Sequence, residues 1–415
     1  MLKTMILGVK TVVWSVSNSR MTVQQPHPMA GNVAGGQMHH QLQKGMSEAE
    51  CLLVARLLKS GLECFAIYNS GPDASAQEEK DVLDYFAGVF TVLDVRNFTQ
   101  VFQLQMPFLY ARVLKNATMS TMLQHFLANS TVSRSFADIL LTFLVERIEA
   151  LGSPEEPQAA VLLRLFKLVF GSITLFPENE PLLRPHLNTI VTQAMRHAAH
   201  AAQPANHFSL LRALFKSIGG GKFEQLYKEF LPLLPALLQG LIGAHAASHL
   251  PQVRELLLEL CLTLPARLSS LLPYLHMLMR PVLHALRASP ELVSLALRTL
   301  EFWIDHLHPG FLAPLLSPVM RSLLLALTKQ LQPAPYPFGA VALRILGKLG
   351  GRNRQYLHLH EPLPCTATAA PLFAVTIPPS LPPAVGGRPS ALRLPLDAPL
   401  ARALELLQSG GRTAR

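Results

Sequence analysis

Residues 210–241 read LLRALFKSIGGGKFEQLYKEFLPLLPALLQGL, and after a short polar gap residues 259–286 read ELCLTLPARLSSLLPYLHMLMRPVLHAL. Leucine recurs through both stretches at helical spacing, which gathers apolar side chains on helix faces. Proline interrupts this pattern five times, at Pro232, Pro235, Pro265, Pro273 and Pro281. Because proline lacks an amide hydrogen and clashes with the preceding turn, a helix tolerates it in the first turn and not in the interior. The block therefore predicts several short helices that need neighbours on more than one side.

The composition extends this prediction to the whole chain. Half of the 415 residues are hydrophobic and 15% are charged, which excludes the disordered class, and the length exceeds one compact core. Leucine dominates, and β-branched runs are rare outside residues 373–377, which favours helix. Apolar segments continue to about residue 349 with a pairing period near 35 to 50 residues, typical of HEAT or armadillo arrays. The predicted fold class is all-α, a HEAT-like solenoid of stacked antiparallel helix hairpins.

Composition also changes along the chain and predicts its domain organisation. Ser47 is expected to cap a helix whose first turn holds Glu48 and Glu50. The chain opens inside an apolar helical pattern, which favours a fragment of a longer protein. Three segments are expected first: the end of a preceding HEAT helix (1–16), a flexible polar insert (17–46) and the HEAT-repeat solenoid (47–360). A proline-rich irregular segment (361–394), which contains a strand-like run at 373–377, and a short helix and tail (395–415) follow.

Charge and hydropathy exclude several kinds of partner. The net charge is +10, but residues 341–415 hold nine Lys or Arg against three Asp or Glu, while the first 340 residues are nearly balanced. A solenoid that grips nucleic acid is expected to spread basic residues along one face, so no direct nucleic-acid contact is expected. The first apolar run contains Lys10 and Trp14 and lacks a cleavage site, so we expect neither a signal peptide nor a membrane partner.

The cysteines point to no disulfide framework and to no metal site. Four are present, with no CxxC spacing. Cys51 and Cys64 fall on one predicted helix, where the rise per residue separates them by about 20 Å, too far for a disulfide. Free thiols that are buried as small hydrophobic side chains are the expected outcome.

The sequence contains no complete catalytic or metal-binding motif. The run from Gly219 to Lys222 resembles a phosphate-binding loop, but that motif requires glycine at position 216 and Ser or Thr at 223, where this chain has Lys216 and Phe223. A turn between two helices is the better interpretation. Kinase signatures are absent, and Ser269 lies in no nucleophile elbow. Three pairs of histidines lie close together in the sequence: His276 and His284, His306 and His308, and His358 and His360. None of these pairs belongs to an HExxH motif or has the spacing of zinc ligands.

No catalytic, cofactor-binding or metal-binding residue is therefore predicted, and no small-molecule substrate is expected. The partner-binding residues stay open. Six phenylalanines at helical spacing are interpreted as core: Phe86, Phe90, Phe166, Phe170, Phe208 and Phe215. A chain of apolar helices without catalytic groups is typical of arrays that present surfaces to other proteins.

Several long strings resemble a known family. They include KTMILGVKTVVW (3–14), EEKDVLDYFAGVFTVLD (78–94), LFKLVFGSITLFPENEPLLRPHL (165–187) and LRILGKLGGRNR (343–354), besides the block quoted first. Over most of residues 1–360 the chain resembles the N-terminal HEAT region of the pseudokinases related to phosphatidylinositol 3-kinase. The resemblance returns weakly near residues 396–407, and residues 17–46 and 361–394 depart from the family pattern.

The resemblance implies a nuclear, non-catalytic scaffold of histone acetyltransferase coactivator complexes of the SAGA and NuA4 types. Its implied partners are complex subunits and transcription activators. The alternative is an importin-like transport or general protein-interaction adaptor, for which two tryptophans and a basic charge are a poor fit. An active kinase fragment is a third reading, which the missing motifs oppose.

Overall fold

The computed structural model describes residues 2–18, 46–68, 76–154, 156–332, 335–352, 372–376, 391–395 and 403–404. Up to Arg352 these residues are almost entirely helical, which confirms the predicted solenoid class. The chain divides into two compact units, Met1–Phe230 and Leu231–Arg415. Most of the predicted insert (17–46) and of the last two predicted segments lies outside the described residues, so the domain bounds stay predictions.

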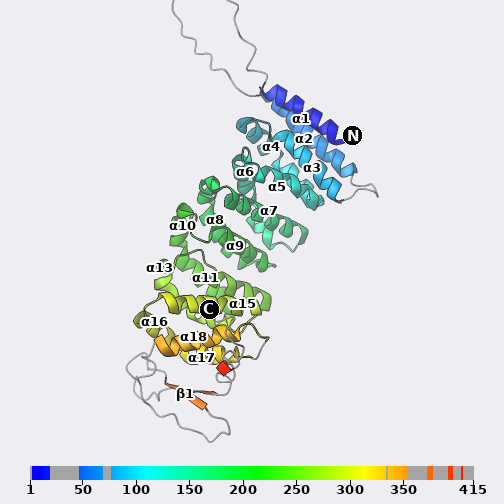
Figure 1. Cartoon of the computed structure of the whole chain (residues 1–415). Helices are drawn as coiled ribbons and strands as arrows, with labels where there is room; N and C mark the ends of the chain where they lie inside the picture. Colours follow the sequence, from blue (N-terminus) through cyan, green and yellow to red (C-terminus); the bar gives the residue numbers. More distant parts are fainter. Residues whose placement is uncertain are drawn as a thin grey trace, which may run out of the picture. The chain divides into compact units, whose positions relative to one another are not determined.

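The N-terminal unit contains two rows of helices, in which each helix packs on the next but one along the chain (Figure 1). One row consists of α1 (Leu2–Asn18), α3 (Ala76–Phe90), α5 (Ser120–Ala128), α7 (Glu156–Leu175) and α9 (Pro204–Ile218). The other row consists of α2 (Glu48–Tyr68), α4 (Val95–Lys115), α6 (Ser133–Val145), α8 (Glu180–Ala198) and α10 (Glu224–Phe230). Short 3₁₀ turns lead into or out of helices: η2 (Ala117–Met119), η3 (Ile148–Gly152) and η4 (Pro177–Asn179).

The C-terminal unit repeats this arrangement with proline-broken helices. Its helices are α11 (Leu234–Ala247), α12 (Pro251–Leu262), α13 (Leu268–Leu271), α14 (Leu275–Ala285), α15 (Pro290–His306), α16 (Pro309–Leu316), α17 (Met320–Lys329) and α18 (Gly339–Arg352). The 3₁₀ turns are η5 (Leu231–Leu233), η6 (Leu272–Tyr274) and η7 (Ser317–Val319). Strands β1 (Leu372–Thr376) and β2 (Ala391–Pro395) form an antiparallel hairpin; β1 overlaps the predicted strand-like run, whereas β2 was missed.

The prolines of the opening block lie mainly where helices begin. Pro235 and Pro273 occupy the first or second position of α11 and η6, as expected. The expectation is wrong for Pro281, which lies inside α14 and is buried there. Its neighbours Leu278, Met279 and Val282 are also buried, so packing offsets the lost helical hydrogen bond.

Local capping agrees with the sequence at two places. The Ser47 hydroxyl accepts from the Glu50 amide at 3.4 Å while the Glu50 carboxylate accepts from the Ser47 amide at 2.6 Å, a reciprocal capping box at the start of α2. Gly220 and Gly221 have φ of 84° and 74°, a left-handed conformation that glycine adopts without strain. The glycine run is therefore the predicted turn, here between α9 and α10.

The repeat period appears both in helix positions and in polar contacts. In the N-terminal unit, the helices of the row that begins with α2 start at Glu48, Val95, Ser133, Glu180 and Glu224, which are 38 to 47 residues apart, and in the C-terminal unit α13 and α16 start 41 residues apart. Side-chain contacts link residues about one period apart, for example Arg184 Nε to Glu229 Oε1 at 2.8 Å. The Glu180 carboxylate accepts from the Gln225 and Leu226 amides, and so caps α10 from the preceding repeat. The predicted period of 35 to 50 residues is confirmed.

The core of the N-terminal unit is an aromatic cluster. Phe126 on α5 lies among four other buried rings, with centroid distances of 4.8 to 6.5 Å, mostly in edge-to-face geometry: Phe90, Phe98, Phe102 and Phe136. The six phenylalanines predicted as core are all buried.

Truncation of the central ring tests this core. Phe126→Ala is expected to destabilise α5 and α6 by about 3–5 kcal/mol, because it leaves a cavity among rings that cannot collapse into it. Leu104→Ala is the control; Leu104 is 60% exposed and the change should cost less than about 0.5 kcal/mol. Hydrogen exchange of the α5 and α6 amides measures both, and equal protection in the two variants would contradict the assignment.

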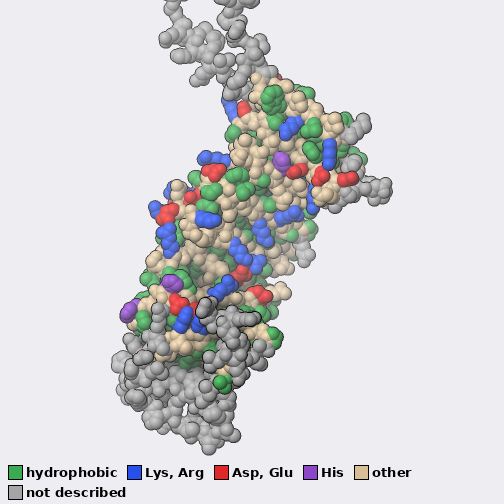
Figure 2. Space-filling view, viewed as in Figure 1, with side chains coloured by type: hydrophobic (Ala, Val, Ile, Leu, Met, Phe, Trp, Pro, Cys, Tyr) green, Lys and Arg blue, Asp and Glu red, His purple; other side chains and the backbone are tan. Residues whose placement is uncertain are grey.

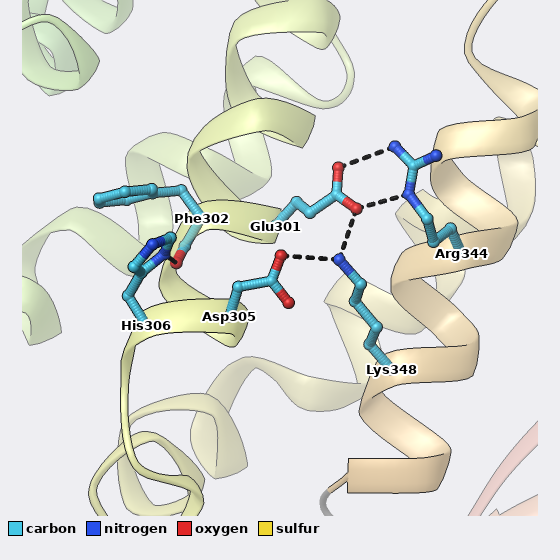
Figure 3. A network of polar contacts seen from close by, with 6 residues as sticks. All are labelled: Glu301, Phe302, Asp305, His306, Arg344 and Lys348. Atoms are coloured by element: carbon cyan, nitrogen blue, oxygen red, sulfur yellow. Dashed lines mark hydrogen bonds and ion pairs between the residues drawn. The ribbon is translucent and has the colours of Figure 1, made fainter. Parts of the chain in front are cut away.

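A charged network ties α15 to α18 in the C-terminal unit (Figure 3). Glu301 accepts two bonds from the Arg344 guanidinium, at 2.6 and 3.0 Å, and Lys348 Nζ lies 2.7 Å from both Glu301 and Asp305. The hydrogen bond from Arg344 and then that from Lys348 lower the pKa of Glu301 to about 2. Glu301 is the most enclosed member, with 17% of its side chain exposed.

The network predicts acid sensitivity. The folded pKa of Glu301 lies below its ordinary value of 4.5, so its stabilisation is present above about pH 4.5 and is lost as pH falls towards 2. Glu301→Gln should lower the stability of this unit by about 1 kcal/mol at neutral pH and flatten its acid dependence. The free energy of unfolding is measured by urea titration over a pH series, with the fluorescence of the buried Trp303 as the signal. A Trp14→Phe background removes the other tryptophan. Glu255→Gln, the same charge change outside the network, should leave the profile unchanged; equal profiles in both would refute the role.

Candidate protein-interaction surface

A groove between α7 and α9 combines basic and apolar side chains. On α9, Arg212 and Lys216 lie one helical turn apart, and both reach the surface, because Arg212 is half-buried and Lys216 is exposed. Together with Lys167 of α7 they line a groove of about 750 Å³ whose apolar part includes Phe170 and Leu175. Figure 2 shows Lys and Arg side chains gathered over this part of the chain.

A second groove, of about 820 Å³, lies between α1 and α2 and is apolar. Met5, Val12 and Leu53 line it and are each more than 60% exposed. Contiguous exposed apolar surface is typical of contact sites. The sequence did not distinguish these positions from core positions. The helical period identifies the apolar face of a helix, but it does not show whether another helix covers that face.

A polar cavity of about 650 Å³ lies where η3 meets the end of α8 and the start of α9. His207 lines it and is fully buried, and within the described residues neither of its ring nitrogens has a hydrogen-bond partner. The His197 ring is stacked 6.0 Å away, and a Cβ at Gly152 would come within 3.0 Å of His207 Nε2. Burial, and then the charge of His197, lower the pKa of His207 to about 4.

The histidine pairs of the sequence do not converge on a common centre. His306 Nδ1 donates to the Phe302 carbonyl at 2.8 Å, on the side of α15 away from the ion pairs (Figure 3). His308 instead accepts from the Gly310 amide and caps α16. His276 and His284 both lie on α14, but the His284 ring packs against His245, with centroids 5.1 Å apart. His358 and His360 fall outside the described residues.

The other candidates have structural positions. Among the described residues no group of three or more His, Cys, Asp or Glu could hold a metal ion. Ser269 lies in the short helix α13. Cys51, Cys64 and Cys261 are free; burial raises the pKa of Cys261 to about 12, whereas Cys64 is exposed, contrary to the expectation of buried thiols. The absence of catalytic, cofactor and metal sites stays a prediction.

Within the described residues, three helical stretches are long and apolar enough to cross a membrane by length and composition alone: Pro157–Leu175, Glu224–Ala247 and Pro309–Lys329. The expectation of no membrane partner rests on the first apolar run, which is not among these three stretches. Each of these stretches has buried side chains, such as Phe166, Leu238 and Leu323, and the helices that carry them (α7, α11 and α17) pack against neighbouring helices. Their hydropathy follows from burial on two sides.

Two rows of antiparallel helices with this period define a HEAT-type helical-repeat protein. The family described as the Tra1 HEAT repeat central region matches residues 1–334, and the chain belongs to this family. It is 39% identical over 99% of its length to the "Transformation/transcription domain-associated protein" of Homo sapiens. It is 42% identical over 69% of its length to the "SAGA complex/NuA4 acetyltransferase complex subunit TRA1" of Saccharomyces cerevisiae.

The family predicted from the sequence strings is thereby confirmed. The chain spans about a tenth of the length of these relatives, 10% of the human protein and 8% of the yeast protein. Among solved structures, the crystal structure of Kap121p is similar with a TM-score of 0.36 and 11% identity, over 70% of this chain and 34% of that one. That likeness is too weak to support any functional argument.

The buried His207 predicts a pH effect on stability. Its folded pKa of about 4 lies below the ordinary value of 6.5, so the unfolded state takes up a proton first, and stability is lost as pH falls from about 6.5 to 4. The loss should reach about 2–3 kcal/mol in the N-terminal unit. His207→Leu should remove this loss, as measured by hydrogen exchange of α9 over a pH series.

The control is His200→Gln, at an exposed position in the wall of the same cavity, which should keep the acid sensitivity. An unchanged pH slope in His207→Leu would show that another group titrates.

Proposed function

We propose that this chain is a non-catalytic scaffold segment of a transcription coactivator complex of the SAGA or NuA4 histone acetyltransferase type, and that it acts in the nucleus. Membership of the Tra1 family supports the proposal, as do the names of two yeast relatives, which are subunits of these complexes. The observation that carries it is the packing of helices within each unit: most helices contact neighbours before and after them in the chain, and the faces that remain exposed are available to partner proteins.

The mechanism is geometric. A stack of hairpins tied at each repeat holds its surface grooves at fixed spacing, so subunits bound to different repeats keep a defined separation. The α7–α9 groove fits a helix that has one apolar face flanked by acidic side chains, because Lys167, Arg212 and Lys216 complement the charge and the exposed Leu175 complements the apolar face. The partner there is a subunit of the complex or an activator segment, and no small-molecule substrate is involved.

A tagged copy of the chain tests the proposal in cells. It is expected in the nuclear fraction and to co-purify with histone acetyltransferase activity and with the subunits that carry it. Mass spectrometry of the purified material identifies the partners. Recovery with unrelated complexes alone, or with a transport GTPase, would refute the scaffold assignment.

The α7–α9 groove predicts a sharper effect. The double variant Lys167→Glu, Lys216→Glu reverses two charges and should reduce recovery of acidic helical partners roughly tenfold or more, since like charges then face each other. Arg134→Glu, an exposed α6 position outside the groove, is the charge control. Thermal unfolding should be similar in all variants. Full recovery in the groove variant would place the contact elsewhere on the array while leaving the scaffold proposal intact.

A further inference from the structure

Basic side chains from three helices meet at the ends of α11 and α14 in the C-terminal unit. The His245 ring, in the last turn of α11, lies 5.1 Å from the His284 ring, in the last turn of α14. Arg280 lies one turn before His284 and Arg287 lies just after it, so helical spacing puts both beside that ring. Arg254, near the start of α12, acts electrostatically on both histidines.

Among the described residues, no acidic side chain forms an ion pair with this cluster. Burial and then the neighbouring His284 and Arg254 lower the pKa of His245, whereas burial and then Arg254, Arg287 and Arg280 lower that of His284. Glu255 and Glu259 of α12 and Glu291 of α15 lie on elements packed nearby, yet none of them offsets these effects. In the described part of the chain, Arg287 contacts only the Ser322 carbonyl, at 3.4 Å, and Arg254 and Arg280 form no ion pair.

Helix dipoles explain only part of this arrangement. His245, His284 and Arg287 lie near helix C-termini, where positive charge is favourable. Arg254 lies near the N-terminus of α12, where it is unfavourable, and Arg280 lies in the middle of α14. Arg254, Arg280, His284 and Arg287 are exposed. The cluster therefore concentrates basic groups at exposed positions with no acidic partner in the described part of the chain, unlike the charged networks that link other repeats.

We propose that His245, Arg254, Arg280, His284 and Arg287 form a binding site for a phosphorylated Ser or Thr side chain of a partner protein. A phosphomonoester carries a charge near −2 with three acceptor oxygens, and guanidinium groups donate to it in paired fashion. The two imidazoles each gain a proton when such a dianion binds between them. A nucleic acid is disfavoured, because its phosphates need basic residues along a stripe and these five are gathered at one repeat junction.

This site is independent of the acetyltransferase assignment, because it concerns a local charge cluster that exists whichever complex holds the chain. The test uses the whole 415-residue chain and a short alanine–glycine peptide that carries one phosphoserine. Ring resonances of His245 and His284 are followed by NMR during titration with this peptide, with the unphosphorylated peptide, with inorganic phosphate and with a short DNA duplex. Arg254→Gln and Arg280→Gln are compared with Arg134→Gln, which removes the same charge in the other unit.

The expected result is saturable binding of the phosphopeptide at pH 7, with the pKa of both histidines raised on binding. Arg254→Gln and Arg280→Gln should each weaken binding roughly tenfold, since each removes a charge-assisted contact, while Arg134→Gln should have no effect. Binding of inorganic phosphate at the same resonances also supports the site. Equal binding of the unphosphorylated peptide, tighter binding of the duplex, or equal losses in all three variants would overturn the proposal.

Discussion

The structure depends on one constraint: almost every helix must bury two sides, one against its hairpin partner and one against the next helix of its own row. A helix that is apolar on two sides is insoluble alone, and a chain that returns to the same row every 38 to 47 residues supplies both neighbours. This accounts for the leucine-rich composition and for helices whose hydropathy is high enough for a membrane. The Phe126 cluster shows this burial in the N-terminal unit, because α4, α5 and α6 all contribute rings to it.

Apolar faces made largely of leucine do not specify register well, because shifting one face along another changes little in buried area. The polar contacts between repeats supply the missing specificity. A carboxylate such as Glu180 can cap the next helix only when the two helices are aligned to within a hydrogen-bond length, and the fork of Arg344 fits Glu301 in one orientation. Such contacts recur at the repeat period in both units. They therefore fix the register between neighbouring hairpins, which the apolar contacts alone leave poorly defined.

The sequence predicted features that depend on residues close together in the chain: the Ser47 capping box, the glycine turn and the phenylalanine core. It failed at Pro281, where packing from other helices overrides the local rule, and at Cys64, whose exposure depends on what lies opposite. Contacts between repeats were missed, because they join residues about one period apart and periodicity alone does not align them. A signal existed in opposite charges about one period apart, as in Arg184 and Glu229 or Glu301 and Arg344.

The contacts between repeats also show which surfaces are free to serve partners. Where neighbouring repeats meet with opposite charges, as at α15 and α18, the polar groups satisfy one another and the surface is closed to a charged ligand. Where basic side chains gather without an acidic partner among the described residues, as Arg254, Arg280 and Arg287 do around His284, or where a histidine is buried without a partner, as at His207, the fold loses stability that a substitution by a neutral or apolar residue would recover. In an array with so few charged residues, positions that oppose stability are the places to look for contacts made with other molecules. The binding surface of a scaffold is thus expected at repeat junctions that lack the ion pairs and hydrogen bonds found between other repeats.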